Sequence, residues 1–392
     1  MRSISDTIAR LAASRRLPGT AGQDPAPGRL DDLGRFCPNP GGLAAKTYLP
    51  KDIPVGAPLV VVLHGCTQTA GGYDIASGWS ALADEAGFAL LYPEQQRANN
   101  PNLCFNWFNP SDTARGTGEV GSIVAMIEAM LATHGLDRRR VFVTGLSAGG
   151  AMAASLLATH PELFAGGGIV AGLPHGIAAT VPEAFDRMRG HGVPGPDALR
   201  RRLETASPHD GPWPTLSIWH GTDDRTVDRS NAEALLAQWH EAHGLDRLES
   251  RTETIGRATR RVWRDADGIE RVESYTIPGM GHGTPLDTAG PGGLGTVAPY
   301  MLDVGLNSTR RMAAFWGLAE APAAQPGRAS AARPQPAPAR SGAARVPSPG
   351  PQAKPRAKRP TAERPAPPRP DRPAKGIGQV IEDALRKAGL MR

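Results

Sequence analysis

Short apolar runs recur along the middle of the chain and alternate with segments of helical periodicity. Six of these runs are rich in Val, Ile and Leu, and they cover residues 59–63, 88–92, 141–144, 168–171, 216–219 and 272–277. Most of them lack polar alternation, which is the pattern of strands buried on both faces by covering helices. The runs therefore predict a central, mostly parallel β-sheet.

Two helical segments connect successive runs. Residues 122–134 place apolar side chains on one face at helical spacing, and Gly135 follows as a stop signal. A second helix is expected to begin directly after Ser147 and to end near Thr159. Because strands and helices alternate, we expect the α/β class with a doubly wound, mostly parallel sheet.

Residues 173–213 interrupt this alternation with Pro, Gly and two short helical stretches. The segment is expected as an insertion over the carboxyl edge of the sheet. It can serve as a lid or substrate wall, or it can be a plain surface excursion. Both interpretations stay open at this stage.

The composition divides the rest of the chain. Residues 43–319 hold nearly all aromatic and branched aliphatic side chains and form the expected catalytic domain, after a partly helical N-terminal extension at 1–42. Residues 320–375 are rich in Pro, Ala and Arg and cannot bury enough apolar surface to fold, so a disordered basic linker is expected. Residues 376–392 return to amphipathic spacing and predict a C-terminal helix that docks on the domain or on a partner.

The positive charge of the chain is concentrated in its C-terminal tail. From Glu320 onward there are 15 basic and 5 acidic side chains, a net of +10, whereas the whole chain carries +6, so the remainder is near −4. The tail is interpreted as a solvated linker or as a contact for an acidic surface or nucleic acid. No specific nucleic-acid partner is expected for the folded domain.

The sequence contains no apolar run of membrane-spanning length, and arginines interrupt the N-terminal segment where a signal peptide needs an apolar core. These features favour a cytoplasmic protein. Three cysteines, Cys37, Cys66 and Cys104, allow at most one disulfide and lack metal-type spacing. We expect neither a metal nor a cofactor.

The strongest chemical signal is the segment Gly145-Leu146-Ser147-Ala148-Gly149 between an apolar run and a helix. A G-x-S-x-G motif in this context turns a strand sharply into a helix and exposes the serine hydroxyl, as in the α/β-hydrolase fold. The helix N-terminus favours developing negative charge nearby. Ser147 is the expected nucleophile.

A serine nucleophile needs a histidine base and an orienting acid, which follow it in the chain in this fold. His282 stands in a Gly-rich loop directly after the run at 272–277 and is the expected base. The acid should follow the run at 216–219, where Asp223, Asp224 and Asp228 are available, and the spacing favours Asp224. His160, His240 and His243 lie in helical patterns and are expected at the surface.

Acyl transfer also needs two hydrogen-bond donors for the oxyanion. The backbone N–H groups of Ala148 and Cys66 are expected to form this oxyanion hole, because Ala148 follows the nucleophile and Cys66 lies in the His64-Gly65-Cys66 loop after the first run. The Cys66 side chain can pair with Cys104 or stay reduced. Its role as a nucleophile is disfavoured because no elbow surrounds it.

The segment from Gly116 to Gly121 matches the G-x-G-x-x-G dinucleotide fingerprint letter by letter. That motif has meaning only directly after a strand, because its glycines carry the turn that brings the pyrophosphate to a helix N-terminus. The preceding residues are polar and carry Pro110, so no strand is expected there. Nucleotide binding is therefore not predicted.

Together these blocks resemble the polyhydroxybutyrate depolymerase-type esterases, a family that also includes feruloyl esterases. The resemblance covers about residues 44–318 and rests on blocks such as HGCTQTAGGYD, LLYPEQQRANNPNLCFNWF, RGTGEVGSI, GLSAGGAM, WHGTDDRTV and ESYTIPGMGHGTP. It implies the same triad, Ser147, Asp224 and His282.

The resemblance also implies that Asn106, Trp107, Phe108 and Arg115 lie near the active-site face, although Trp107 and Phe108 can equally be core aromatics. Members of the family are often secreted and cut short-chain hydroxyalkanoate polyesters, so the resemblance suggests an extracellular protein. This sequence departs from such members by lacking a recognisable signal peptide and an appended substrate-binding domain.

The sequence thus predicts a serine esterase that acts on short-chain aliphatic hydroxyalkanoate esters through an acyl-enzyme. One alternative is a feruloyl or acetyl carbohydrate esterase with the same triad. Another is a protein that binds granules or a partner through its basic tail.

Overall fold

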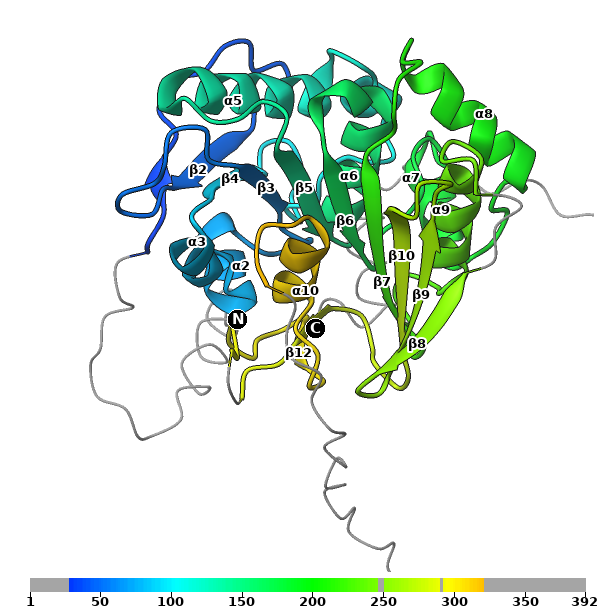
Figure 1. The fold of residues 1–392 in the computed structure, drawn as a ribbon. Coiled ribbons are helices and arrows are strands. Elements are labelled where there is room, and N and C mark those ends of the chain that lie inside the picture. Colours follow the sequence, from blue (N-terminus) through cyan, green and yellow to red (C-terminus); the bar gives the residue numbers. More distant parts are fainter. Residues whose placement is uncertain (1–27, 246–249, 290–291, 321–392) are drawn as a thin grey trace, which may run out of the picture.

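The computed structural model describes residues 28–245, 250–289 and 292–320. In this part of the chain a ten-stranded sheet runs through the molecule in the order β1-β2-β4-β3-β5-β6-β7-β10-β9-β8. The strands β3, β4, β5, β6, β7 and β10 are mutually parallel, and antiparallel strands flank them on both sides. The prediction of a doubly wound, mostly parallel α/β sheet is confirmed (Figure 1).

The six parallel strands correspond to the six apolar runs of the sequence. Their bounds are β3 Leu59–Leu63, β4 Ala89–Glu94, β5 Val141–Leu146, β6 Gly166–Val170, β7 Thr215–Gly221 and β10 Glu270–Ile277. All residues of β3, β5 and β6 are buried, because helices cover both faces of the sheet at these strands.

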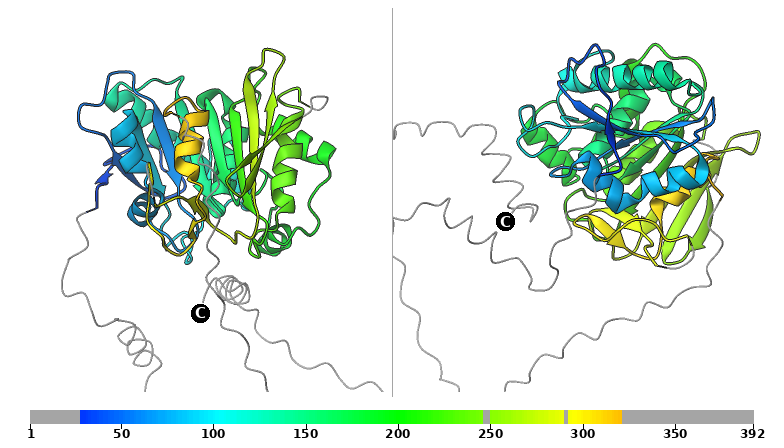
Figure 2. Two further views of the ribbon diagram at one scale, coloured as in Figure 1. Left: turned by 60° about the horizontal axis from the view of Figure 1, so that its bottom comes forward. Right: turned by 90° about the vertical axis from the view of Figure 1, so that its left-hand side faces the viewer.

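Helices form a layer on each face of the sheet. One layer contains α5 (Gly118–His134), α6 (Ala148–Thr159), α8 (Pro196–Ala206) and α9 (Ser230–His240), and the other contains α2 (Ala70–Ser77), α3 (Trp79–Ala86) and α10 (Ser308–Phe315). Alternate residues of β3 pack into the two layers: Val61 contacts the first and Val62 the second. Figure 2 shows this sandwich from the β1–β2 edge.

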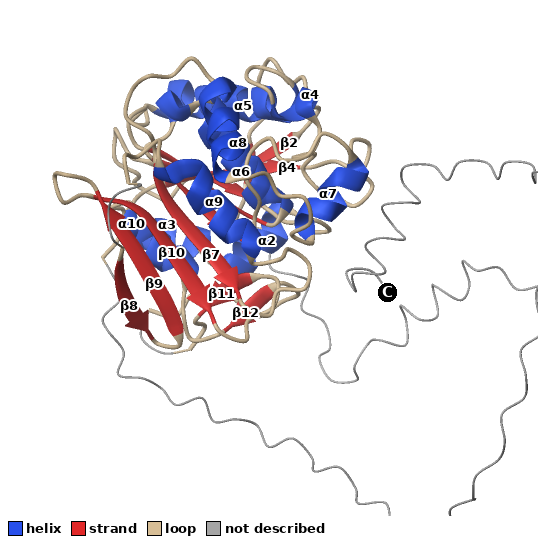
Figure 3. Cartoon of the chain, turned by 90° about the vertical axis from the view of Figure 1, so that its right-hand side faces the viewer, coloured by secondary structure: helices blue, strands red, loops and turns tan. Residues whose placement is uncertain are grey.

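The remaining strands lie at the margins of the fold. They are β1 (Asp31–Asp32), β2 (Ala44–Tyr48), β8 (Arg251–Ile255), β9 (Ala258–Arg264) and the small separate pair of β11 (Thr284–Leu286) and β12 (Met301–Asp303). The hairpin of β8 and β9 extends the sheet beyond β10, whereas α9 packs against β7 and α8 packs against α9 (Figure 3). These strands were not predicted, since they lack continuous apolar runs.

The glycine-rich segment that imitates a dinucleotide motif has a packing role. It connects the short helix α4 (Pro110–Thr113) to α5, so a helix and not a strand precedes it. Gly118 has a φ of +47°, and a side chain there would collide with the Asp112 backbone. The segment closes a tight turn between two helices.

None of the described helices combines the length and apolar character needed to cross a bilayer. The expected linker at 320–375 lies outside the described residues except for Glu320, and the C-terminal helix at 376–392 lies wholly outside them. Of the extension at 1–42, the structure describes only the part from Gly28 onward.

Candidate active site

Ser147 occupies a sharp turn between β5 and α6. Its backbone has φ +57° and ψ −117°, a conformation that non-glycine residues rarely adopt, and its amide donates to the Val170 carbonyl of the neighbouring strand at 2.9 Å. The sequence prediction of a strand, a strained serine and a helix at this point matches the structure. The turn aims the serine at the carboxyl edge of the sheet.

The two glycines of the motif allow close backbone contacts around the turn. A Cβ atom on Gly145 would lie 2.4 Å from the carbonyl carbon of Gly149, and one on Gly149 would lie 2.5 Å from the carbonyl oxygens of both Leu63 and His64. Gly149 thus lets the first turn of α6 touch the end of β3. This contact brings Ser147 beside the loop that contains Cys66.

His282 and Asp224 meet across the ends of two neighbouring parallel strands, β7 and β10. The distance from His282 Nδ1 to Asp224 Oδ2 is 2.7 Å, and the carboxylate side chain is fully buried. Because an ionised carboxylate only accepts, Nδ1 carries the proton and donates a hydrogen bond to Asp224. The other ring nitrogen, Nε2, is left as the basic atom.

Asp224 is held from both sides. Its Oδ1 accepts from the amides of Thr226 at 2.8 Å and Val227 at 2.9 Å. Burial opposes ionisation of this carboxyl, but the hydrogen bonds from His282 and from the Val227 amide keep its pKa below the usual value. Asp224 is therefore a carboxylate at neutral pH.

The other two candidate acids have different contacts. Asp223 accepts from the Thr222 hydroxyl at 3.0 Å, and Asp228 accepts from the amide of Ser230 at the start of α9. The structure thus brings His282 together with Asp224 and not with its neighbours.

His220 is a buried residue beside this pair and was not among the predicted site residues. Its Nε2 lies 2.8 Å from the Val227 carbonyl oxygen and 3.5 Å from Asp224 Oδ2. Burial lowers the pKa of His220 despite the nearby Asp224 carboxylate. The neutral ring donates a hydrogen bond to the Val227 carbonyl and thereby stabilises the turn that contains Asp224. Only its four-residue spacing from Asp224 could have indicated this role.

Two backbone N–H groups beside Ser147 are free to act as donors. Ala148 is the first residue of α6, where the N–H has no intrahelical acceptor. On the facing loop, the Gly65 amide donates to Gln68 Oε1 and the Thr67 amide donates to the Asn102 carbonyl. The Cys66 amide between them has no acceptor among the described residues.

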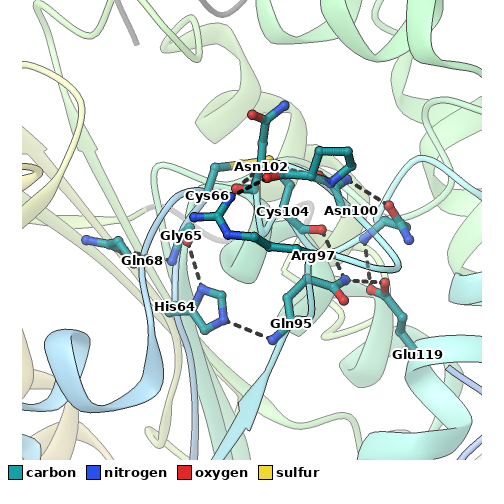
Figure 4. Close-up of a disulfide and its surroundings, with 12 residues drawn as sticks. His64, Gly65, Cys66, Gln68, Gln95, Arg97, Asn100, Asn102, Cys104 and Glu119 are labelled. Carbon is teal, nitrogen blue, oxygen red and sulfur yellow. Dashed lines mark hydrogen bonds between the residues drawn. A yellow bond between two sulfur atoms is a disulfide. The ribbon is translucent and has the colours of Figure 1, made fainter. Parts of the chain in front are cut away.

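A disulfide joins Cys66 to Cys104, whose Cα atoms are 4.2 Å apart (Figure 4). The sequence left open whether this pair is bridged. The bond ties the loop after β3 to the loop after β4, while Cys37 is exposed and unpaired. The free amide of Cys66 thus belongs to a cross-linked loop.

An apolar pocket opens beside Ser147. Its walls come from both disulfide cysteines, the aromatic pair Trp107 and Phe108, the segment after β6 and the helix α7 (Val181–Met188). In α7 the side chains that face the pocket are Val181, Ala184, Phe185 and Met188. The inserted segment at 173–213 therefore contributes a wall of the pocket and is more than a surface excursion.

The structure corrects one expectation and refines another. Arg115 lies away from the pocket: its guanidinium binds the Thr159 carbonyl at the far end of α6 and forms an ion pair with Glu162 at 2.5 Å. The expectation that it lies near the active-site face was wrong, because the turn before α5 directs it toward the C-terminus of α6. The Asn106 side chain does not line the pocket, and its Oδ1 accepts a hydrogen bond from the Asn100 side chain at 3.0 Å. Trp107, the next residue, does line the pocket.

Comparison with known proteins places this site in context. Residues 43–259 match the family described as esterase PHB depolymerase. Poly(3-hydroxyalkanoate) depolymerase C of Paucimonas lemoignei is 44% identical over 292 residues, which are 74% of this chain and 70% of that protein. Feruloyl esterase B of Talaromyces stipitatus is 28% identical over 273 residues, 66% of this chain and 74% of that protein.

Among solved structures, an acetyl xylan esterase from Aspergillus awamori matches with a TM-score of 0.63 at 23% identity. The match covers 74% of this chain and 100% of that one. At this identity the likeness shows the shared fold alone.

Proposed function

Because the chain belongs to the esterase PHB depolymerase family and is a carboxylic ester hydrolase, we propose that it cleaves short-chain aliphatic hydroxyalkanoate esters through an acyl-enzyme on Ser147. The observation that carries this proposal is the strained, half-buried Ser147 in an apolar pocket that Val227 also lines. The Val227 amide binds Asp224, which in turn binds His282. The 44% identity to a poly(3-hydroxyalkanoate) depolymerase supports the substrate class.

The first step is attack of the Ser147 hydroxyl on the ester carbonyl. His282 takes the serine proton at Nε2 and then gives it to the leaving alcohol. Asp224 keeps the imidazole in the tautomer that exposes Nε2 and stabilises the imidazolium that forms. A water molecule, activated by the same histidine, then releases the hydroxy acid from the acyl-enzyme.

The developing oxyanion needs two donors in a site from which water is excluded. The free N–H groups of Ala148 and Cys66 are proposed for this role, and the helix N-terminus at Ala148 adds favourable electrostatics. Removal of one such donor in serine hydrolases costs about 10²- to 10³-fold in kcat.

The pocket lining supports an aliphatic acyl group. Apart from Ser147 and Asn100, the side chains around it are apolar or belong to the disulfide. A hydroxyalkanoate unit presents a small alkyl branch that such walls desolvate favourably. A sugar face would place hydroxyl groups against walls that offer few hydrogen-bond partners.

The decisive experiment compares the wild type with Ser147→Ala on hydroxybutyrate oligomers, amorphous polyester granules, nitrophenyl esters of increasing length and methyl ferulate. We expect hydrolysis of the oligomers, and a fall in kcat of about 10⁴-fold or more in the variant, because the nucleophile is lost. Ser111→Ala, in the exposed part of α4, is the matched control. Near-normal turnover by Ser147→Ala would end the assignment.

A second candidate is a feruloyl or acetyl carbohydrate esterase with the same machinery. The 28% identity to a feruloyl esterase supports it, as does the aromatic pair Trp107 and Phe108 in the pocket wall, with ring centroids 5.8 Å apart. Activity confined to methyl ferulate and nitrophenyl acetate in the same panel would favour this candidate. Granule attachment through the basic tail stays a separate prediction, since the tail lies outside the described residues.

A further inference from the structure

The peptide unit between Gly65 and Cys66 carries the N–H group proposed to bind the oxyanion. A trans peptide is planar, so the Cys66 N–H points opposite to the Gly65 carbonyl. Any group that holds this carbonyl therefore aims the Cys66 amide. Two donors hold it, His64 Nδ1 at 2.8 Å and the Gln68 amide at 3.3 Å.

The hydrogen bonds of His64 fix the roles of its two ring nitrogens. Nε2 faces the amide N–H of Gln95 at 3.2 Å and must accept, so Nδ1 carries the proton and donates to Gly65. The ring is buried against Phe105, and burial lowers the pKa of His64. The imidazole is thus neutral with one defined tautomer.

Gln95 is the next link, directly beyond the end of β4. It is 2% exposed, and its side-chain nitrogen donates to Glu119 Oε1 at 2.5 Å and to the Cys104 carbonyl at 3.1 Å. Its side-chain oxygen accepts from the Gln96 backbone amide and from the Asn99 side chain. These bonds fix the backbone of Gln95 and hence the N–H that faces His64 (Figure 4).

Glu119 anchors this network in the first turn of α5. It is fully buried, and its second oxygen accepts from the Asn106 amide at 2.8 Å, immediately before Trp107 in the pocket wall. Burial raises the pKa of Glu119 to about 8, although its N–H donors oppose the shift. The Glu119 side chain thus holds both Gln95, which binds His64, and Asn106, which precedes the pocket residue Trp107.

We propose that Gln95 and Glu119 are positioning residues of the reaction, which act through His64 to aim the Cys66 N–H at the oxyanion. The inference rests on the proposed function, because an oxyanion forms only when Ser147 attacks an ester. The Cys66–Cys104 disulfide acts in the same direction, since it joins the aimed peptide to the loop that Gln95 holds.

The principal test is Gln95→Met, which keeps the side-chain length and removes its hydrogen bonds. We expect kcat to fall about 10- to 100-fold with KM within about twofold of wild type, because the oxyanion exists only beyond the ground state. Gln96→Met is the matched control: the Gln96 side chain bonds the Gly42 carbonyl instead, and its kcat should stay within about twofold of wild type.

A second readout separates positioning from a general loss of stability. A boronic acid forms a tetrahedral adduct with the serine, so its inhibition constant should rise by the same factor by which kcat falls. A role limited to stability would lower the melting temperature and the titrated fraction of active sites. The kcat per active site and the inhibition constant of the boronic acid would then be unchanged. That result would overturn the inference.

A double-mutant cycle with His64→Ala tests the route. In that background Gln95→Met should lower kcat by less than about threefold, and fully multiplicative losses would show that Gln95 does not act through His64.

If Gln95→Met does not fold, Glu119→Gln replaces it. One acceptor oxygen of Glu119 then becomes a donor, and kcat should fall about 3- to 10-fold. Unchanged kcat with inactive Ser147→Ala would refute the inference alone, whereas an active Ser147→Ala would refute the proposed function.

Discussion

The two sides of the proposed site, the acid–base side around His282 and the oxyanion side around Cys66, are constructed differently. On the acid–base side, His282 is oriented by one side-chain hydrogen bond to Asp224, and Asp224 is held by two backbone amides and the nearby His220. On the oxyanion side, a disulfide and a chain of buried hydrogen bonds through His64, Gln95 and Glu119 connect two loops with a helix.

This difference predicts which substitutions change only the rate of the reaction and which also change the stability of the fold. A carboxylate that orients a base can be replaced by an amide of the same shape, with little change in packing. A buried cross-linked network loses stability whenever a member is removed, because polar groups are left unpaired. Substitutions on the acid–base side should therefore change mainly kcat, and those on the oxyanion side should change both kcat and stability.

The largest effect is expected for Asp224→Asn. The amide can donate to His282 Nδ1 and thereby stabilise the wrong tautomer, so kcat should fall about 10³- to 10⁴-fold while the melting temperature changes little. Steady-state kinetics and a thermal melt measure both quantities. Asp223→Asn is the control, because Asp223 has no contact with His282. Equal losses in both variants would refute the assignment of Asp224.

The disulfide should give the largest effect on stability. It closes a loop of 38 residues, for which the chain-entropy relation gives about 4 kcal/mol. The double variant Cys66→Ala and Cys104→Ala should lose about this much free energy of unfolding in a denaturant titration, together with part of its kcat. Cys37→Ala should change neither. An unaltered free energy in the double variant would mean that the buried network alone holds the loops.

Acid should weaken the fold through two histidines that belong to neither side of the proposed site. Burial, reinforced by nearby arginines, lowers the pKa of His175 and of His243 to about 4. Above pH 6.5 both are neutral in either state. Below it the unfolded chain binds protons that the folded chain does not, so stability falls until about pH 4.

The expected loss from these two histidines is about 4 kcal/mol between pH 7 and pH 5. Denaturant titrations at several pH values measure it, and His175→Asn should flatten the slope. If the free energy of unfolding of the wild type does not change with pH, any loss of activity in acid must arise in the pocket alone.

The smallest effect is expected in the wall that belongs to neither side. Phe185 in α7 lines the pocket, and its replacement by alanine should widen it. Nitrophenyl esters with longer acyl chains should gain about 3- to 10-fold in kcat/KM relative to the acetate ester, since one or two methylene groups contribute about 1 kcal/mol each. An unchanged acyl-length profile would place the acyl group elsewhere.

The central sheet could be predicted because burial on both faces imposes long apolar runs. The marginal strands could not, because β8 is largely exposed and its sequence RTETI alternates with polar residues as a loop can. Helix α2 was missed because Gly71 and Gly72 weaken its signal, although Thr69 caps it through the Gly72 amide.

For the candidate site, the motif around Ser147 and the order of strands pointed to Ser147, Asp224 and His282, and the structure joins the last two by a hydrogen bond. The role of each stays a prediction. The network behind Cys66 could not be predicted, since a buried Gln or Glu looks like a surface residue when its partners lie far away in the sequence. His160 was predicted at the surface and is 7% exposed: it packs at the end of α6, where burial lowers its pKa to about 4.

The contact of Gly149 with the Leu63 and His64 carbonyls makes the spacing between nucleophile and oxyanion loop a property of the bare backbone. No choice of side chain can tune that spacing, whereas α7 belongs to an insertion outside the sheet. Diversification of substrate range by evolution or by design can therefore proceed by exchange of residues 173–213, which form one wall of the pocket, while the sheet is inherited unchanged.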